Sequence, residues 1–359
     1  MIEREDRTDR LVLEANRNHW NTERGPRLER VIFRNDVSPA EALELCISGE
    51  GEVDIVTEVS PGDAARVQAS QYADLVAVDA NRVLVGIINR SADAPLDDAL
   101  ARRALNLAVD KQKIIDQGLL GYARPLCALT PSWCSGFPQG AQPYGHDPEQ
   151  ARQLVSQAGW PEGRSMRLAT PRPLEGIARM MASDIEAALG ISVDVVAVPD
   201  EQLLAGARRL MEKKLPLPWD ILVHGWFDLS SEAPPAVIHR EFFGMDGAFR
   251  AGPVLPMFDA LFSEMARELA PAKLVQVAER IDRYVFDEAL AIFLCAPQAL
   301  YAVNKHVNFG PYRTTFELAD TEVSEEHWSR TGARAGTQTA SGGRDQPADF
   351  AGASSGNAC

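Results

Sequence analysis

The stretch INRSADAPLDDALARRALNLAVDKQKIIDQGLLGYARP, residues 88–125, joins the end of an apolar strand to two capped helices. Asp97 or Asp98 is placed to cap the first helix, whose apolar residues recur close to one face. Asp110 is placed to cap the second helix, and Gly121 is expected to end it. A strand that leads directly into capped helices predicts a sheet flanked by helices, which is an α/β fold.

Strands and helices also alternate in the sequence on both sides of this stretch. Strands are expected at 9–15 and 28–34, and Ser38-Pro39-Ala40-Glu41 is a capping-box pattern that starts a helix. The later elements are a helix opened by Asp147 and ended by Gly159, strands at 166–170, 191–198 and 220–225, and helices at about 254–270 and 272–288.

The order of these elements predicts two α/β lobes. We assign residues 1–131 to a first lobe, to which residues 300–328 return, and residues 132–299 to a second lobe. The proline-rich and glycine-rich segment 125–146 is the expected first crossing, and 296–304 is the expected return. Two crossings form a hinge about which one lobe can close on the other.

Charge and composition narrow the classes of function. The 359 residues include 36 Lys and Arg against 51 Asp and Glu, and the net charge of −15 argues against nucleic acid as a partner. No apolar run approaches the roughly 20 residues that a membrane-spanning helix needs. The N-terminus MIEREDRTDR contains no secretory signal, so we expect a cytoplasmic protein if Met1 is the true start. Residues 329–359 contain almost no large apolar side chains and are predicted to be disordered.

Motifs for catalysis and for metal binding are absent from the sequence. The five cysteines are scattered, and free thiols are favoured over a Cys127–Cys134 bridge. The six histidines show no HExxH spacing, and the chain has no GxSxG, P-loop or GxGxxG motif. We therefore expect a protein that is not an enzyme, with no catalytic residue, no metal and no cofactor.

Five stretches, in order over residues 11–318, together resemble one family. They are EANRNHWNTERGPRLERVIF (14–33), GEGEVDIV (49–56), the stretch at 88–125, YGHDPEQARQLVSQAGWPEG (144–163) and DILVHGWFDLSSEAPP (220–235). The family is the extracytoplasmic solute-binding proteins of ABC importers, family 5, in the oligopeptide-binding and dipeptide-binding branch. The resemblance implies a two-lobed, periplasmic-binding-protein-like fold of type II (a Venus flytrap). Because such proteins begin with a signal peptide and a further segment of the first lobe, it also implies that this lobe is incomplete here.

The resemblance places a ligand in the cleft between the lobes. The family uses an acidic residue of the Gly-Trp loop for the ligand's ammonium group, which here points to Asp228 after Gly225 and Trp226. Asp228 follows the tryptophan by two positions where the family has three, so Glu232 is the alternative acid. The competing interpretations are a solvated loop residue or helix cap for Asp228 and core packing for Trp226.

Three further residues are candidates for the ligand site. His224 precedes Gly225 and would make binding depend on pH if it faces the cleft, but a structural histidine is the alternative. Arg172 follows a strand and matches a ligand carboxylate, unless it is an exposed loop residue. Asn89 ends a strand, where it either bonds backbone near the cleft or stabilises a turn. Arg102 and Arg103 are expected to form ion pairs and caps.

The predicted function is the binding of peptides or similar small polar solutes for an ABC importer, in the periplasm or another extracytoplasmic location. Its membrane subunits would recognise the closed form, and a separate chain that completes the first lobe is a further expected partner. Two alternatives remain: a cytoplasmic sensor or interaction protein built on the same fold, and a fragment that binds no ligand.

Overall fold

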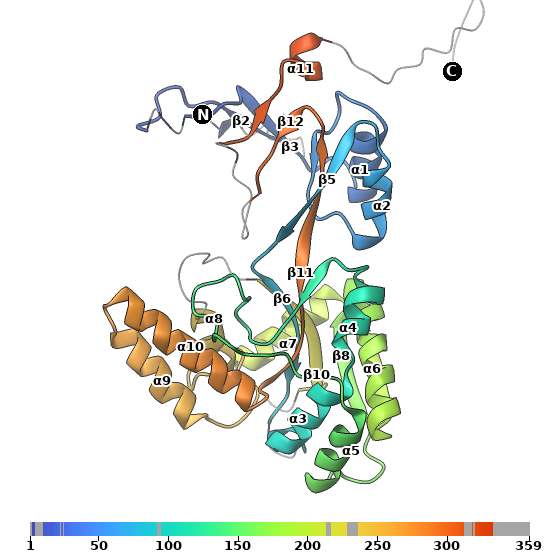
Figure 1. Ribbon diagram of the computed structural model, residues 1–359, viewed down its shortest axis with the longest axis vertical. Helices are drawn as coiled ribbons and strands as arrows, with labels where there is room; N and C mark the ends of the chain where they lie inside the picture. The colour runs from blue at the N-terminus through green and yellow to red at the C-terminus, as the bar shows by residue number, and fades with distance from the viewer. Residues whose placement is uncertain are drawn as a thin grey trace, which may run out of the picture.

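The computed structural model describes residues 2–3, 10–21, 23, 25–91, 95–212, 217–227, 236–311, 318 and 320–332. Figure 1 shows two lobes, which we call lobe I (above) and lobe II (below), joined by long strands. Lobe I holds a three-stranded antiparallel sheet, helices that cover one face of the end of a second sheet, and the returning C-terminal part of the chain. Its elements are β1 (Ile2–Glu3), β2 (Arg10–Glu14), β3 (Arg30–Arg34), α1 (Pro39–Ser48), β4 (Ile55–Val56), η2 (Pro61–Asp63), α2 (Ala64–Gln68), β5 (Ala73–Asp79), β12 (Val307–Asn308), β13 (Glu322–Val323) and α11 (Trp328–Thr331).

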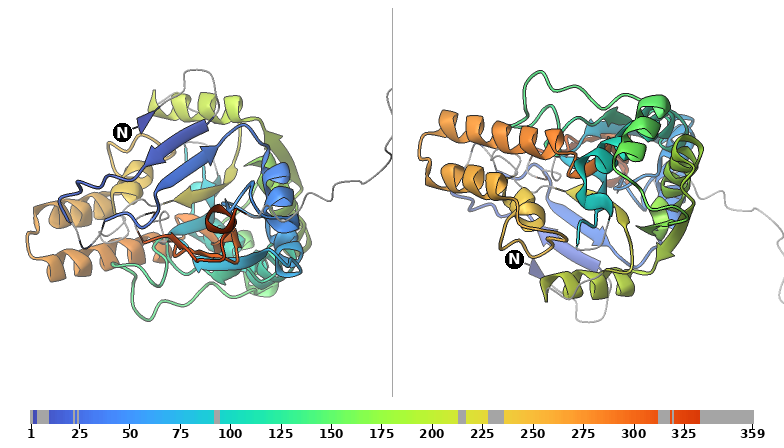
Figure 2. Two further views of the ribbon diagram at one scale, coloured as in Figure 1. Left: turned by 90° about the horizontal axis from the view of Figure 1, so that it is seen from above. Right: turned by 90° about the horizontal axis from the view of Figure 1, so that it is seen from below.

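One mixed sheet extends from lobe I into lobe II, where helices cover both of its faces. The strand order is β4-β11-β6-β10-β8-β9, and β5 and β7 also pair with β11. Figure 2 shows α9 and α10 on one side of this lobe and α5 and α6 on the other. The elements are β6 (Arg82–Ile88), η3 (Pro95–Asp97), α3 (Ala99–Ala108), α4 (Lys111–Lys113), the π-helical turn η4 (Ile114–Gly118), β7 (Ala123–Pro125), α5 (Pro148–Gln157), β8 (Met166–Pro171), η5 (Arg172–Leu174), α6 (Glu175–Leu189), β9 (Val193–Val198), α7 (Asp200–Met211), β10 (Ile221–Phe227), α8 (Ala236–Phe243), α9 (Pro256–Arg267), α10 (Pro271–Asp287) and β11 (Ala291–Asn304).

Successive side chains of β6 point to opposite faces of the sheet and pack into two separate cores of lobe II. Leu84 and Ile88 pack with α3 to α6, whereas Val83 and Val85 pack with α8 to α10. This period of two is what a sheet covered on both faces requires, and it explains why the strand is apolar throughout. The caps expected for α3 and α4 are present, since Asp98 accepts a hydrogen bond from Leu100 N at 2.7 Å and Asp110 accepts one from Lys113 N at 3.0 Å.

The two lobes are joined by strands rather than by an irregular loop. β11 pairs with β6 over residues 291–295 and with β5 over residues 298–304, so it runs through both lobes. β5 and β6 follow it in the opposite direction, and they make the other crossing at Ala80 and Asn81. The expected crossing at 125–146 is therefore wrong.

The segment after β7 instead packs inside lobe II. Leu129 N and Thr130 N donate to the Asp282 carboxylate of α10 at 3.0 and 2.8 Å. The helices at 95–118 share a core with α5 and α6. We therefore propose a lobe boundary near residue 80 in place of the expected one at 131.

The C-terminal part of the chain returns to lobe I. The expected disordered segment at 329–359 begins inside α11, and residues 333–359 lie outside the described ranges. Among the helices that the structure describes, none has the length and apolar character to cross a bilayer.

None of the cysteines in the described ranges forms a disulfide bond. They are Cys46, Cys127, Cys134 and Cys295. Burial raises the pKa of Cys46 and of Cys295 to about 12, so both remain protonated at neutral pH.

A buried lysine gives the fold a measurable pH dependence. Lys111 begins α4, its ammonium donates to the Asn106 carbonyl, and burial lowers the pKa of Lys111 to about 7. In the unfolded chain a lysine keeps a pKa of about 10.4. Between these values the unfolded state binds a proton that the native state lacks, so the contribution of Lys111 to stability improves as pH rises and worsens as pH falls.

We expect the free energy of unfolding of the Lys111→Met variant to show a smaller increase between pH 7 and pH 9 than that of the wild type. The expected difference is about 1 kcal/mol per pH unit, which follows from a single titrating group. Urea unfolding of both proteins at several pH values measures it, and identical pH profiles would contradict it.

Candidate functional site

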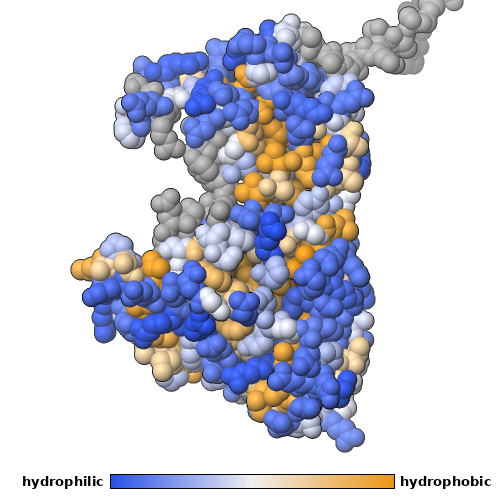
Figure 3. Space-filling model, viewed as in Figure 1, coloured by the Kyte–Doolittle hydropathy of each residue, from blue (hydrophilic) through white to orange (hydrophobic). Residues whose placement is uncertain are grey.

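Three parallel strands of lobe II end at one edge of the sheet, which we call the carboxyl edge. β8 pairs in parallel with both β9 and β10. β10 is antiparallel to β6, so the last residue of β10, Phe227, lies opposite the first residue of β6, Arg82. Arg82 directly follows the crossing at Ala80 and Asn81. The carboxyl edge therefore faces lobe I. Open α/β sheets bind ligands at this edge, and Figure 3 shows a deep notch between the two lobes.

Two of the predicted site residues lie at the carboxyl edge. Arg172 is exposed and directly follows β8. Gly225 lies near the end of β10, and a Cβ atom added to it would meet no atom of the described residues within 4 Å. An exposed guanidinium and an open space beside the strand are thus available to a molecule in the notch.

The Gly-Trp loop itself is described only in part. His224 is half-buried in β10, and its Nδ1 is hydrogen-bonded to the Gly225 carbonyl. The backbone of Trp226 pairs opposite Val83, whereas its side chain, Asp228 and Glu232 lie outside the described part of the chain. Their roles in ligand binding remain predictions.

The structure places Asn89 away from the other candidates. Because β6 and β10 are antiparallel, Asn89 follows the far end of β6, where its backbone N donates to Asp220 at 2.8 Å. Its side chain donates to the Trp219 carbonyl at 3.0 Å and accepts hydrogen bonds from Ser91. Asn89 thus lies away from the carboxyl edge, and its turn-stabilising alternative fits these bonds.

An ion pair that no motif predicted connects the lobes beside the carboxyl edge. Arg82, the first residue of β6, lies 3.2 Å from the Glu58 carboxylate of lobe I. Glu58 has φ of 60°, a left-handed backbone conformation that costs roughly 1–2 kcal/mol in a residue with a side chain. Strain of this kind concentrates at functional sites. The two residues are 24 positions apart, so no local pattern in the sequence could have paired them.

Polar side chains hold the strands of the hinge together. The Asp79 carboxylate, at the end of β5, accepts from Gln298 Nε2 at 2.8 Å and from Arg124 Nε at 3.3 Å. The buried amide of Asn81 accepts from Trp133 Nε1 at 3.1 Å. The hinge is thus a defined joint of β5, β6, β7 and β11 rather than a loose connection.

The described ranges contain no candidate site for a metal ion. No group of three His, Cys, Asp or Glu side chains is placed there to hold an ion. The notch instead offers an exposed cation, an interlobe ion pair and open strand ends, which suit a polar organic solute.

Comparison with known sequences identifies relatives over much of the chain. The model of bacterial extracellular solute-binding proteins, family 5, matches residues 1–240. The dipeptide-binding protein of Escherichia coli is 28% identical over 190 residues, 52% of this chain and 34% of that protein. The nickel-binding periplasmic protein of the same organism is 26% identical over 220 residues, 55% of this chain and 40% of its own length. The chain therefore spans well under half the length of these relatives.

Solved structures confirm the two-lobed α/β fold. The ABC transporter substrate-binding protein CtaP of Listeria monocytogenes superposes with a TM-score of 0.77 at 18% identity, over 90% of this chain and 65% of that one. DppA of Helicobacter pylori, solved with the peptide STSA, gives a TM-score of 0.70 at 16% identity, over 90% of this chain and 62% of that one.

Proposed function

The chain belongs to the bacterial extracellular solute-binding proteins of family 5, and we propose from this that it binds a peptide or a similar small polar solute in the notch. The family consists of solute-binding proteins rather than enzymes. The observation that carries the proposal is the meeting of the carboxyl edge with the hinge of β5, β6, β7 and β11, since ligand binding there would favour the closed arrangement of the lobes. We propose that the membrane subunits of an ABC importer bind the closed form of the protein.

A peptide is the solute class that best uses the charges near the notch. A zwitterionic peptide needs a carboxylate partner for its ammonium group and a cation for its own carboxylate. We assign the first role to Asp228, with Glu232 as the alternative, and the second to Arg172. Trp226 would pack against the body of the ligand. A relative that binds dipeptides supports this choice.

A further partner follows from the sheet of lobe I. None of the described residues of β2 and β3 is fully buried. We propose that another polypeptide segment, in a separate chain, packs against this part of the lobe.

Calorimetric titration with alanyl-phenylalanine and its N-acetyl derivative tests the proposed function. The wild type should bind the free dipeptide about 10–100-fold more tightly, because only that form presents an ammonium group for a charge-assisted hydrogen bond. Asp228→Asn should remove this preference, whereas the matched variant Glu232→Gln should keep it.

The reverse result for the two variants would move the ammonium partner to Glu232. A preference that survives in both variants would contradict a role for this loop in recognising the ammonium group. A protein that binds neither peptide would refute the proposed ligand class.

A further inference from the structure

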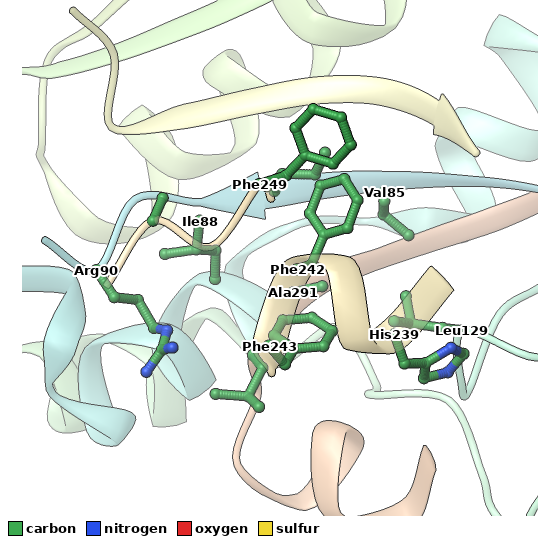
Figure 4. Close-up of a pocket in the computed structure, with 12 residues that line it drawn as sticks. Val85, Ile88, Arg90, Leu129, His239, Phe242, Phe243, Phe249 and Ala291 are labelled. Carbon is green, nitrogen blue, oxygen red and sulfur yellow. The ribbon is translucent and has the colours of Figure 1, made fainter. Parts of the chain in front are cut away.

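A second pocket lies within lobe II, between β6 and α8. Figure 4 shows Phe242, Phe243 and Phe249 between Arg90 at one end and His239 at the other. The rings of Phe242 and Phe249 have centroids 5.2 Å apart. Arg90 follows the far end of β6, whereas the notch lies at the Arg82 end, so the two sites are separate.

Arg90 is a buried cation, and few hydrogen bonds or opposite charges stabilise its guanidinium. Its exposed fraction is 4%, and its guanidinium donates no hydrogen bond to any residue in the described ranges. The carboxylate that faces it, Asp97, is 3.8 Å away and half-exposed. Burial, together with the positive charges of Arg102 and Arg250, lowers the pKa of Arg90 to about 10. An isolated buried charge is costly unless an opposite charge or hydrogen bonds stabilise it.

Arg102 shows how the same lobe satisfies a buried arginine elsewhere. It is equally buried, yet its guanidinium donates to the carbonyl oxygens of Leu96, Asp97, Glu288 and Ala289. Arg90 has no comparable set of acceptors in the described structure.

Arg250 adds a second guanidinium, which is close enough to Arg90 for its charge to lower the pKa of Arg90. The loop before α9 is pressed against Arg90, because Arg90 N donates to Ala251 at 2.7 Å and a Cβ on Gly252 would lie 2.7 Å from the Arg90 Cβ. The Nη1 of Arg250 donates to the Gly252 carbonyl, whereas its buried Nε has no hydrogen-bond partner and its guanidinium forms no ion pair among the described residues. His239 differs, since its Nε2 lies 3.1 Å from the buried Asp282 carboxylate.

We propose that Arg90 and Arg250 bind the carboxylate of a small organic acid whose apolar or aromatic body lies against the three phenylalanines. A guanidinium matches a carboxylate with two parallel hydrogen bonds, and burial strengthens such a pair. The phenylalanine rings favour an apolar body over an inorganic anion. This site does not depend on the solute proposed for the notch.

Titration calorimetry with 3-phenylpropionate and its neutral analogue 3-phenylpropanamide tests this site on the full chain. The acid should bind at least about tenfold more tightly than the amide, because only the acid carries the charge that the arginines recognise. Arg250→Gln, at a half-exposed position, should reduce acid binding about tenfold and leave amide binding unchanged. Arg90→Met should abolish the preference if circular dichroism shows that the variant is folded.

Arg240→Gln is the matched control, since Arg240 lies on α8 but pairs with Glu241 at 3.0 Å. It should change the affinity for neither probe. Equal affinity for acid and amide, no binding of either, or unchanged acid binding in Arg250→Gln would overturn the proposal. Displacement of the acid by a dipeptide would also overturn it, because the acid would then occupy the notch.

Discussion

Replacing Arg102 with methionine is expected to lower the free energy of unfolding by about 3 kcal/mol or more. Arg102 comes from α3, is 3% exposed, and donates to Leu96 and Asp97 of η3 at 3.1 and 2.6 Å. It also donates to Glu288 and Ala289, just after α10, at 2.8 and 3.2 Å. Methionine keeps much of the apolar stem but leaves these carbonyl oxygens without their donor, and an unsatisfied buried acceptor costs about 1–3 kcal/mol.

Arg103→Met is the matched control for this prediction. Arg103 is the next residue of the same helix, but its side chain is 39% exposed, donates to the Asp287 carbonyl and lies 4.0 Å from the Glu288 carboxylate. Solvent replaces that bond readily, so the expected loss is below about 1 kcal/mol. Urea unfolding curves of the two variants decide the matter, and equal losses would show that burial of the Arg102 guanidinium contributes nothing.

The helices around Arg102 were predictable because their signals are local. Asp98 and Asp110 cap helices that begin next to them in the sequence, so a pattern of a few residues was sufficient. The acceptors of Arg102 were not predictable, because Glu288 lies 186 positions away. The sequence indicated only ion pairs and caps for this residue, and most of its bonds are to backbone.

The hinge shows the same limit on a larger scale. The apolar residues of β5 and β6 are typical of strands, but the alignment of these strands along β11 depends on contacts across more than half of the chain. The segment 125–146 has the composition of a crossing because it is a loop, and composition does not reveal that Asp282 holds it inside lobe II.

The positions of the candidate site residues were predictable where a residue directly ends or follows one of the parallel strands. Arg172 and Gly225 lie at the carboxyl edge because each belongs to the end of a parallel strand. Asn89 also ends a strand, but β6 runs opposite to β10, and this direction moves Asn89 to the other end of the sheet. Strand direction is a property of the sheet and is absent from any single segment.

Replacing Asp282 with alanine should destabilise the protein by about 3–5 kcal/mol, because it removes a buried carboxylate that joins three segments. Oδ1 accepts from Leu129 N at 3.0 Å and lies 3.1 Å from Nε2 of His239 in α8. Oδ2 accepts from Thr130 N at 2.8 Å. Without the carboxylate, the partly buried N–H of Leu129, the buried N–H of Thr130 and the buried imidazole of His239 all lose this acceptor.

A double-mutant cycle with His239→Leu separates the imidazole from the backbone bonds. Asp282→Ala should cost about 1–2 kcal/mol less in the His239→Leu background than in the wild type, because the imidazole no longer needs an acceptor. The remaining loss belongs to the hydrogen bonds by which the carboxylate holds the backbone of Leu129 and Thr130 against α10. Full additivity in urea unfolding would mean that His239 and Asp282 do not stabilise each other. A loss that vanishes in the double variant would instead mean that the backbone of the 126–131 segment stays in place without the carboxylate.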